Sequence, residues 1–310
     1  MKKITQFALS AIFGIACASS ALAAESAPSQ PVAQVIVTAH AQQQKATPPT
    51  LDRSDVIVFQ GKQRAVVTDL KPLKGDQSKT QLFIYIDDSL RSSALGTQIP
   101  ALKQFVRQLP SSTEVAIGYM RNGAYALTQD FTTDHARAAD TIRLPVSSPG
   151  LNGSPYFALS YLAKHWPSKE QTDRRVVLML TDGVDRYYTT FSTDNPYLQA
   201  AEKDAQKAGL LVYSVYMRDA GAYGSSSLGV TLGQSLLNQV SEATGGHSYS
   251  EGLNTPVSLT PYLDQFSRAL QNQYKLTFVA KDDSGAQSLK LQTELPGVKL
   301  TGPRTVYIQR

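Results

Sequence analysis

The sequence predicts an α/β protein: a doubly wound, mostly parallel sheet with one antiparallel edge strand, flanked by a β-rich segment formed from strands at the N- and C-terminal ends. From residue 81 onward, apolar strands alternate with amphipathic helices, which is the pattern of βα units. Residues 82–86, 175–180 and 210–217 are almost continuously apolar, as expected of strands covered on both faces. Asn122-Gly123 favours a tight hairpin, so one edge pair should run antiparallel.

Helices are expected between these strands. Apolar residues at intervals of three and four predict a helix over residues 95–109. Capping residues and apolar periodicity predict further helices over residues 133–144, 154–165, 196–207, 232–244 and 260–272. A Gly/Ser-rich insertion at residues 221–229 and a short strand at 247–250 complete this part of the chain.

Both ends of the chain carry strand patterns. Residues 35–38 resemble one strand, and residues 56–59 and 64–68 resemble a hairpin that turns at Gly61-Lys62. Near the C-terminus, strands are predicted over residues 274–280, 288–293 and 305–308. Because neither flank alone makes a convincing sheet, we expect the two to pair into one split β domain.

The predicted organisation has five parts. They are a signal peptide over residues 1–23, a tether with one candidate strand over 24–50, an N-terminal β segment over 51–80, an α/β domain over 81–272 and a C-terminal β segment over 273–310.

The first residues have the features of a secretory signal peptide. Met1-Lys2-Lys3 is cationic, residues 4–17 are mostly apolar, and Ala21-Leu22-Ala23 is a small-x-small cleavage site. We therefore expect export, to the periplasm or the extracellular space. Cys17, the single cysteine of the chain, would leave with this segment, and the residues before it do not favour the alternative of a lipid anchor. No later apolar run reaches about 18 residues, so we expect a mature chain without a membrane span.

Composition and motifs exclude several function classes. The formal charge of +5 comes from 30 basic and 25 acidic residues spread along 310 positions, which does not favour a nucleic-acid partner. The sequence lacks a Gly-x-Ser-x-Gly elbow, a phosphate-binding glycine loop and a His-Glu-x-x-His motif, so we expect no catalysis. Metal-assisted hydrolysis is kept as a minor alternative.

Polar side chains follow two of the predicted strands. Asp87 ends one strand, with Ser89 two residues later, and Asp182 ends another, just before Gly183. In doubly wound sheets, ligands bind outside the carboxyl ends of the strands, and Ser154 should open on the same rim. Carboxylate and hydroxyl oxygens suit Mg²⁺ or Mn²⁺. The alternative is that these side chains only cap helix N-termini.

These residues resemble the metal-ion-dependent adhesion site of von Willebrand factor A (VWA) domains, whose pattern is Asp-x-Ser-x-Ser, a later Thr and a later Asp within Thr-Asp-Gly. Here Asp87-Asp88-Ser89-Leu90-Arg91 is similar to the first part and Leu180-Thr181-Asp182-Gly183 to the last. The resemblance covers about residues 81–272, and both flanks are similar to those of secreted bacterial proteins with this domain. It implies a non-enzymatic binding or adhesion module for a protein ligand, with Asp87, Ser89, Asp182 and Ser154 as metal ligands.

The sequence departs from this pattern at two positions. Arg91 takes the place of the second serine, and Gly153 lies in register for the threonine, with Ser154 one residue late. A guanidinium about 4 Å from a divalent ion would cost roughly 8 kcal/mol at an effective dielectric near 20. A second interpretation is therefore a metal-free site in which Arg91 pairs with Asp87 and Asp182, in a structural or assembly module of the envelope.

Aromatic residues accompany the predicted site. Tyr156 follows Ser154, and Tyr187 and Tyr188 follow Asp182. Loop tyrosines are typical of recognition surfaces because they bury a large area at low entropic cost. We predict that Arg91, Tyr156, Tyr187 and Tyr188 contact a protein ligand, although packing over the helices is the alternative for some of these tyrosines.

Overall fold

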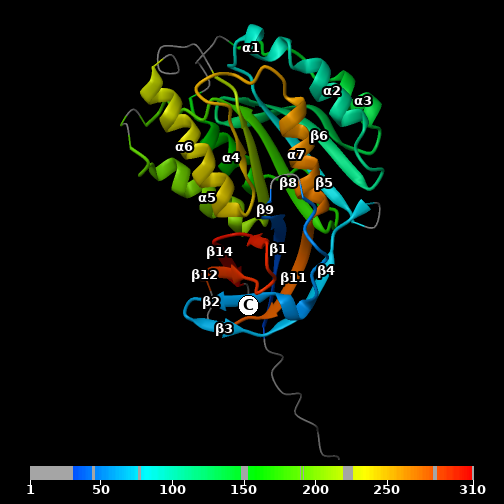
Figure 1. Cartoon of the computed structure of the whole chain (residues 1–310). Helices are drawn as coiled ribbons and strands as arrows, with labels where there is room; N and C mark the ends of the chain where they lie inside the picture. The colour runs from blue at the N-terminus through cyan, green and yellow to red at the C-terminus, as the bar shows by residue number, and fades with distance from the viewer. Residues whose placement is uncertain are drawn as a thin grey trace, which may run out of the picture.

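The computed structural model describes residues 31–43, 46–75, 78–147, 153–188, 190, 192–218, 226–281 and 285–308. The predicted signal peptide and most of the Gly/Ser-rich insertion lie outside these residues. Within them, the chain forms an α/β unit and a β-rich unit, which lies below the α/β unit in the view of Figure 1. Strands from both ends of the chain build the β-rich unit, as the sequence predicts.

A six-stranded sheet forms the centre of the α/β unit, in the order β10-β9-β8-β5-β6-β7. Its strands are β5 (Thr80–Asp87), β6 (Thr113–Arg121), β7 (Ala124–Thr132), β8 (Arg174–Thr181), β9 (Leu210–Tyr216) and β10 (Ser248–Tyr249). Five strands are parallel and β7 is the antiparallel edge. The turn before β7 places Asn122 and Gly123 at φ 52° and 73°, which is the left-handed conformation that tight hairpins need. The predicted fold class is confirmed.

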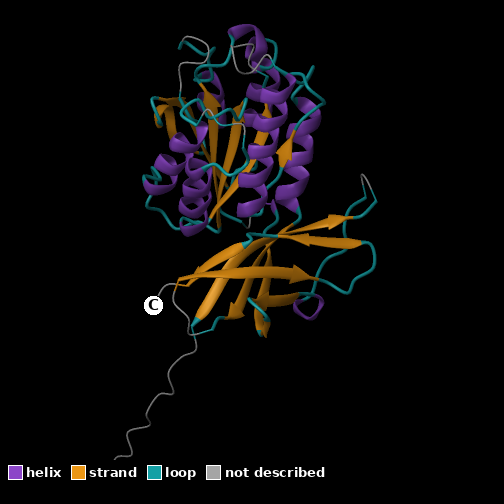
Figure 2. Ribbon diagram, turned by 90° about the vertical axis from the view of Figure 1, so that its left-hand side faces the viewer, coloured by secondary structure: helices purple, strands orange, loops and turns teal. Residues whose placement is uncertain are grey.

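Helices cover both faces of this sheet (Figure 2). They are α1 (Ser92–Gly96), α2 (Ile99–Arg107), α3 (His135–Asp140), α4 (Pro155–Lys164), α5 (Pro196–Lys207), α6 (Ser227–Thr244) and α7 (Thr260–Gln271). One apolar core lies under α1, α2, α3 and α7, and a second lies under α4, α5 and α6. No helix in the described ranges has both the length and the apolar character to cross a membrane.

Three predicted helix boundaries were wrong. The helix expected over residues 95–109 is divided into α1 and α2, because Pro100 fits only the first turn of a helix and so sits at the start of α2. The helix α3 ends at Asp140, before the predicted residue 144. The helix α6 begins at Ser227, where Ser226 accepts a hydrogen bond from the backbone of Gly229 as the N-cap, rather than at Leu232.

Two four-stranded antiparallel sheets make up the β-rich unit, in the orders β13-β1-β11-β4 and β14-β12-β2-β3. A short 3₁₀ helix, η1 (Arg53–Asp55), precedes β2. The strands are β1 (Val32–Ala41), β2 (Ile57–Gln60), β3 (Gln63–Ala65), β4 (Val67–Pro72), β11 (Gln273–Val279), β12 (Gly285–Gln292), β13 (Val298–Thr301) and β14 (Thr305–Ile308). Side chains from both sheets share one apolar core, which includes Val37, Val58 and Phe278.

This unit differs from its prediction in three ways. The candidate strand in the expected tether is the ten-residue β1, which pairs with both β11 and β13. The predicted strand over residues 64–68 is divided between β3 and β4, and these join different sheets. The strand β13 was not predicted, because four residues after a Pro-Gly turn carry little pattern of their own.

Arg174 joins the two units at the start of β8. Its guanidinium donates hydrogen bonds to the hydroxyl of Thr80 at 2.8 Å, to the carbonyl of Leu270 at 2.6 Å and to the side-chain oxygen of Gln273 at 2.8 Å. Leu270 lies in the last turn of α7, where the helix dipole favours a cation. Burial lowers the pKa of Arg174 to about 10, so the side chain is still charged at neutral pH. Gln273 in turn donates to the hydroxyl of Tyr213 in the central sheet.

Replacing Arg174 should destabilise the whole chain. In Arg174→Met, the acceptors on Leu270, Gln273 and Thr80 lose a shared donor, and we expect the free energy of unfolding to fall by about 3 kcal/mol in urea denaturation. The control is Arg175→Met, because Arg175 lies over the Trp166 ring at 5.7 Å and should cost about 1 kcal/mol or less. Equal losses in the two variants would contradict the role given to Arg174.

Candidate functional site at the carboxyl edge of the sheet

Asp87 occupies the carboxyl end of β5 and both of its carboxylate oxygens accept hydrogen bonds. Oδ1 accepts from the backbone N–H of Ser89 at 2.9 Å and from the Ser89 hydroxyl at 2.7 Å. Oδ2 accepts from the hydroxyl of Thr181, at the end of β8, at 2.9 Å. The structure therefore brings together Asp87, Ser89 and the Thr-Asp-Gly segment, as the sequence indicated, but in a closed hydrogen-bond network.

Asp182 follows β8 and is fully buried. Its Oδ1 accepts from the backbone N–H of Val184 at 3.0 Å, and its Oδ2 lies 2.6 Å from Nη2 of Arg186. The side chains of Asp182 and Arg186 are 1% and 11% exposed. Burial raises the pKa of Asp182 to about 6, and the charge of Asp87 adds to this effect, whereas Arg186 opposes it. At neutral pH the site therefore contains a buried, ionised Asp182–Arg186 pair.

Two glycines let the Asp182 loop lie directly against α6. Gly183 adopts φ 67°, which favours glycine, and a Cβ there would lie 2.5 Å from the carbonyl oxygen of Gly233. A Cβ on Gly233 would lie 2.2 Å from the carbonyl oxygen of Asp182. The backbone of the site and the helix are therefore in close contact, with no space for a side chain between them.

Asp88 is also buried, and arginines neutralise it. Arg121 forms an ion pair with its Oδ2, and Nη1 of Arg143 lies 2.8 Å from its Oδ1. Burial acts to raise the pKa of Asp88, but the hydrogen bonds from Arg143 and Arg121 outweigh it and lower the pKa. The backbone N–H of Val146 donates to the same carboxylate at 3.1 Å, so Asp88 holds the loop after α3 against the sheet edge.

The structure shows other roles for two predicted residues. Ser154 is the N-cap of α4, and its hydroxyl accepts from the backbone N–H groups of Tyr156 at 3.2 Å and Phe157 at 3.4 Å. Tyr156 is fully buried, and its hydroxyl donates to the carbonyl of Gly183 at 2.7 Å. The prediction that Tyr156 contacts a ligand was wrong, because this side chain points into the core and supports the Asp182 loop.

Tyr187 covers the position where the resemblance implies a threonine. A Cβ on Gly153 would lie 1.8 Å from the Tyr187 ring, so this ring occupies the space that a side chain at position 153 would need. Tyr187 is 61% exposed and meets the Phe157 ring edge-on at a centroid distance of 5.3 Å. Tyr188 is half-buried and lies 6.4 Å from the ring of Tyr197.

The predicted role of Arg91 is corrected by the structure. Arg91 is exposed at the N-cap position of α1, and the arginine paired with Asp182 is Arg186. Sequence reasoning missed Arg186 and also Asp185, whose carboxylate accepts from the backbone of Tyr187 and from the side chain of Asn195, each at 3.0 Å. The presence of a second arginine in the loop directly after Asp182 is the signal that could have pointed to this pair.

The residues at this edge do not fit a divalent cation. Asp182 is paired with a guanidinium, Asp87 accepts hydrogen bonds on both oxygens, and Ser154 caps a helix. Among the described residues, no group of three or more His, Cys, Asp or Glu side chains is arranged to hold a metal ion. A divalent ion about 4 Å from the Arg186 guanidinium would meet roughly 8 kcal/mol of repulsion at an effective dielectric near 20.

A hollow of about 370 Å³ lies beside the site, along the outer face of α4. Its lining includes Asn122 from the hairpin turn, Phe157 and Tyr161 from α4, and Tyr187. Tyr161 is 38% exposed and stacks on His165 at 4.2 Å. The exposed rings of Tyr161 and Tyr187 therefore give this hollow an aromatic surface next to the carboxyl edge.

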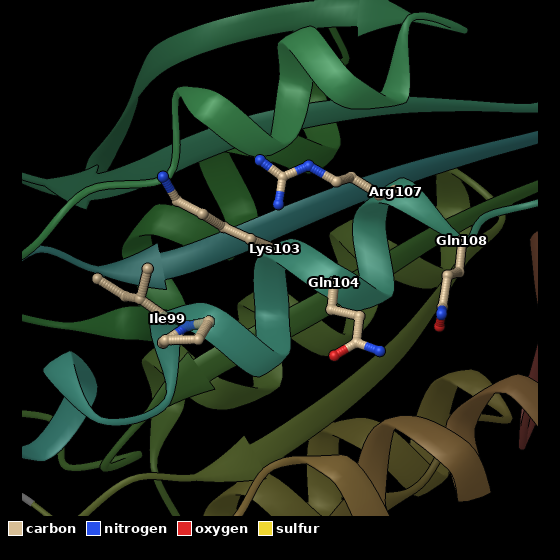
Figure 3. A pocket seen from close by; sticks show the side chains of 6 residues that line it. Ile99, Lys103, Gln104, Arg107 and Gln108 are labelled. Carbon is tan, nitrogen blue, oxygen red and sulfur yellow. The ribbon is translucent and has the colours of Figure 1, made fainter.

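A larger hollow of about 730 Å³ lies elsewhere, on the outer face of α2. Figure 3 shows Lys103, Gln104 and Arg107 projecting from this one helix. Arg107 forms an exposed ion pair with Asp140 of α3. The lining comes from the surface of a single helix, and none of the buried carboxylates contributes to it.

Comparisons with known proteins concern the fold. No protein-family model matches the sequence, and no curated protein matches it. The chain is similar in structure to an aerotolerance-related membrane protein from Bacteroides fragilis, with 13% identity over 62% of this chain and 98% of that chain and a TM-score of 0.42. It is similar to the conserved hypothetical protein BatB from Bacteroides thetaiotaomicron, with 13% identity over 62% of this chain and 97% of that chain and a TM-score of 0.43.

A further similarity is to the three N-terminal domains of the type V pili tip protein Mfa5 from Porphyromonas gingivalis, at 17% identity. It covers 51% of this chain and 28% of that chain, with a TM-score of 0.28. At these identities the similarities concern the fold alone.

The close approach of the Asp182 loop to α6 predicts an unusual effect of a helix substitution. Gly→Ala within a helix normally stabilises by about 1 kcal/mol. We expect Gly233→Ala to destabilise the protein by about 1–3 kcal/mol in urea denaturation, because the new Cβ meets the carbonyl oxygen of Asp182. Ser235→Ala, at an exposed position of the same helix, is the control and should change stability by about 0.5 kcal/mol or less. A stabilised Gly233→Ala variant would show that the Asp182 loop is not in such close contact with α6.

The raised pKa of Asp182 predicts how stability depends on pH. Because its folded pKa of about 6 exceeds the unfolded value near 3.9, the folded state holds this proton more tightly, and the contribution of this group to stability decreases as pH rises from about 4 to 6. Asp182→Asn removes this dependence. Measured by urea denaturation, the stability of Asp182→Asn relative to the native chain should therefore increase by up to about 3 kcal/mol across this range. A relative stability that stays constant or decreases would contradict the raised pKa.

Proposed function

We propose that this protein is an exported, non-enzymatic binding module that recognises a protein partner with the loops at the carboxyl edge of its VWA-like unit. The observation that carries the proposal is the distribution of exposed apolar side chains. Of the ten large apolar side chains that are exposed in the described part of the chain, five lie on these loops and a sixth lies in the first turn of α6. We call these six the apolar rim: Leu144, Val146, Tyr187, Leu228, Leu253 and Val257.

Four members of the apolar rim show how the path of the chain brings them to this edge. Val146 lies in the loop that Asp88 binds, and Tyr187 lies in the loop after β8. Leu228 is in the first turn of α6, which follows β9. Val257, which is 90% exposed, lies between β10 and α7, where its carbonyl accepts a hydrogen bond from Gln98. Exposed apolar side chains gathered at one end of a molecule mark an interaction surface.

The charged network beneath the apolar rim supports this proposal. Asp88 and Asp182 are paired with arginines, and Asp185 accepts two hydrogen bonds, so the loops that carry Val146 and Tyr187 are anchored to the sheet edge. A surface whose backbone is fixed in advance loses less entropy when a partner binds. The aromatic hollow beside Tyr187 extends the same surface along α4.

The positions of the histidines favour binding over catalysis. His40 lies in β1, His135 begins α3, His165 follows α4 and His247 precedes β10. His40, His135 and His247 are thus away from the strand ends that carry Asp87 and Asp182, and the ring of His165 stacks on Tyr161 in the wall of the aromatic hollow. Hydrolysis at these carboxylates would need a general base within hydrogen-bond reach of the reacting atoms, and no histidine is placed for this role.

Site-specific photo-cross-linking in the exporting cell tests the proposal. We expect a photoreactive residue at Val257 or Val146 to cross-link to one partner protein. The same residue at Val66, which is 67% exposed on the β-rich unit, should not do so. With that partner purified, replacing Tyr187 and Tyr188 together by alanine should weaken binding by about tenfold, or about 1.4 kcal/mol. Equal cross-linking at Val66, or unchanged affinity of the double variant, would reject the apolar rim as the binding surface.

A structural or assembly role in the envelope is the alternative function. Cross-links from Val257 only to further copies of this chain would favour this alternative over recognition of a different protein.

A further inference from the structure

We propose that Arg186 supplies the cation of the carboxyl-edge site from within the chain, so that its guanidinium takes the place of a divalent metal ion. The inference concerns the same edge of the sheet as the proposed function, but its test needs no partner. It rests on the charge, the loop contacts and the oxygen atoms at the site.

The charge argument begins with Asp182. A fully buried carboxylate is costly to ionise unless a cation compensates it. Arg186 lies 2.6 Å from its Oδ2 and is itself only 11% exposed, so this guanidinium neutralises Asp182 inside the protein. The nearby charge of Asp87 raises the pKa of Asp182 further, which adds to the need for a cation beside Asp182.

Arg186 also connects the loops that a shared ion would bridge. Its backbone N–H donates to the carbonyl of Gly153 at 2.7 Å, which ties the segment after β8 to the segment before α4. Its side chain ties the same segment back to Asp182. One residue therefore fixes both loops to the sheet edge, and the Tyr187 ring next to it covers Gly153.

Two of the oxygen atoms that could receive a metal already accept two hydrogen bonds each within the protein. The Ser154 hydroxyl accepts from two backbone N–H groups, and Oδ1 of Asp87 accepts from the backbone N–H and the hydroxyl of Ser89. Mg²⁺ is usually held by one or two carboxylates together with several waters, and Asp182, one of the carboxylates at this edge, is already paired with Arg186. An arginine needs only acceptors, and the Asp182 carboxylate provides one.

Thermal unfolding of the native chain and three variants tests the inference, each in a chelator and in Mg²⁺ or Mn²⁺ at pH 7.5. Arg186→Lys keeps the positive charge, and Arg186→Met removes it at similar length. Arg121→Met is the matched control, because Arg121 pairs with Asp88, which retains Arg143 as a second partner. Calorimetric titration of the native chain with Mn²⁺ adds a measurement that needs no variant.

We expect the native Tm to be the same with chelator and with either metal, and calorimetry to show no binding with a Kd of about 1 mM or tighter. In chelator, Arg186→Met should melt lower than Arg186→Lys, because only lysine still compensates Asp182. Mn²⁺ or Mg²⁺ should raise the Tm of Arg186→Met, whose carboxylates then lack a cation, but not that of Arg121→Met.

Several outcomes would overturn the inference. Saturable metal binding by the native chain would show that Arg186 does not occupy the place of the ion. Equal melting of Arg186→Met and Arg186→Lys, or an Arg186→Met variant that metal does not stabilise, would reduce Arg186 to an ordinary ion pair. If metal bound the native chain while cross-linking from Val257 persisted, this inference would fail and the proposed function would stand. If the native chain bound no metal and Val257 cross-linked to no partner protein, only the proposed function would be rejected.

Discussion

Burial of carboxylates at the carboxyl edge of the central sheet is the constraint on which the site depends. Asp87, Asp88 and Asp182 follow two adjacent parallel strands, and each is exposed by 2% or less. Carboxylates that are buried this deeply and this close together must be paired with cations or fully hydrogen-bonded. The chain satisfies Asp87 with hydroxyl and backbone donors, and it satisfies Asp88 and Asp182 with arginines. The loops that carry these donors and arginines are fixed as a consequence.

The sequence predicts well those elements whose residues carry their own pattern. The apolar runs of β5, β8 and β9 are unmistakable, because these strands are buried on both faces. The Asn122-Gly123 turn is equally clear, since it requires two left-handed residues. The strand β1 has a weaker pattern, because Ala, Gln and Thr fill it and its partner β11 lies about 240 residues away, at pairs such as Val35 and Leu276. Such pairing is a property of the assembled fold and not of the segment.

The difference between local sequence pattern and assembled fold also explains which site predictions were correct. Asp87, Ser89 and Asp182 could be placed at one edge, because parallel strands end together there. The cation could not be identified, since both Arg91 and Arg186 follow a strand end closely and only the loop geometry decides which one turns inward. Tyr156 was mistaken for a surface residue, because the N-cap at Ser154 sets the rotation of α4 and turns this side chain into the core.

One central strand connects the two buried arginines. The strand β8 starts at Arg174, which binds the end of α7 and the start of β11, and Asp182 follows its last residue. Arg174 donates hydrogen bonds to neutral oxygens and lies at the C-terminus of a helix, so it attaches the β-rich unit without pairing with a buried anion. Arg186 forms an ion pair with a carboxylate, so its contribution to stability depends on the ionisation of Asp182. Neutral hydrogen bonds therefore stabilise the junction, and an ion pair stabilises the carboxyl edge, at opposite ends of a strand that is buried along nearly its whole length.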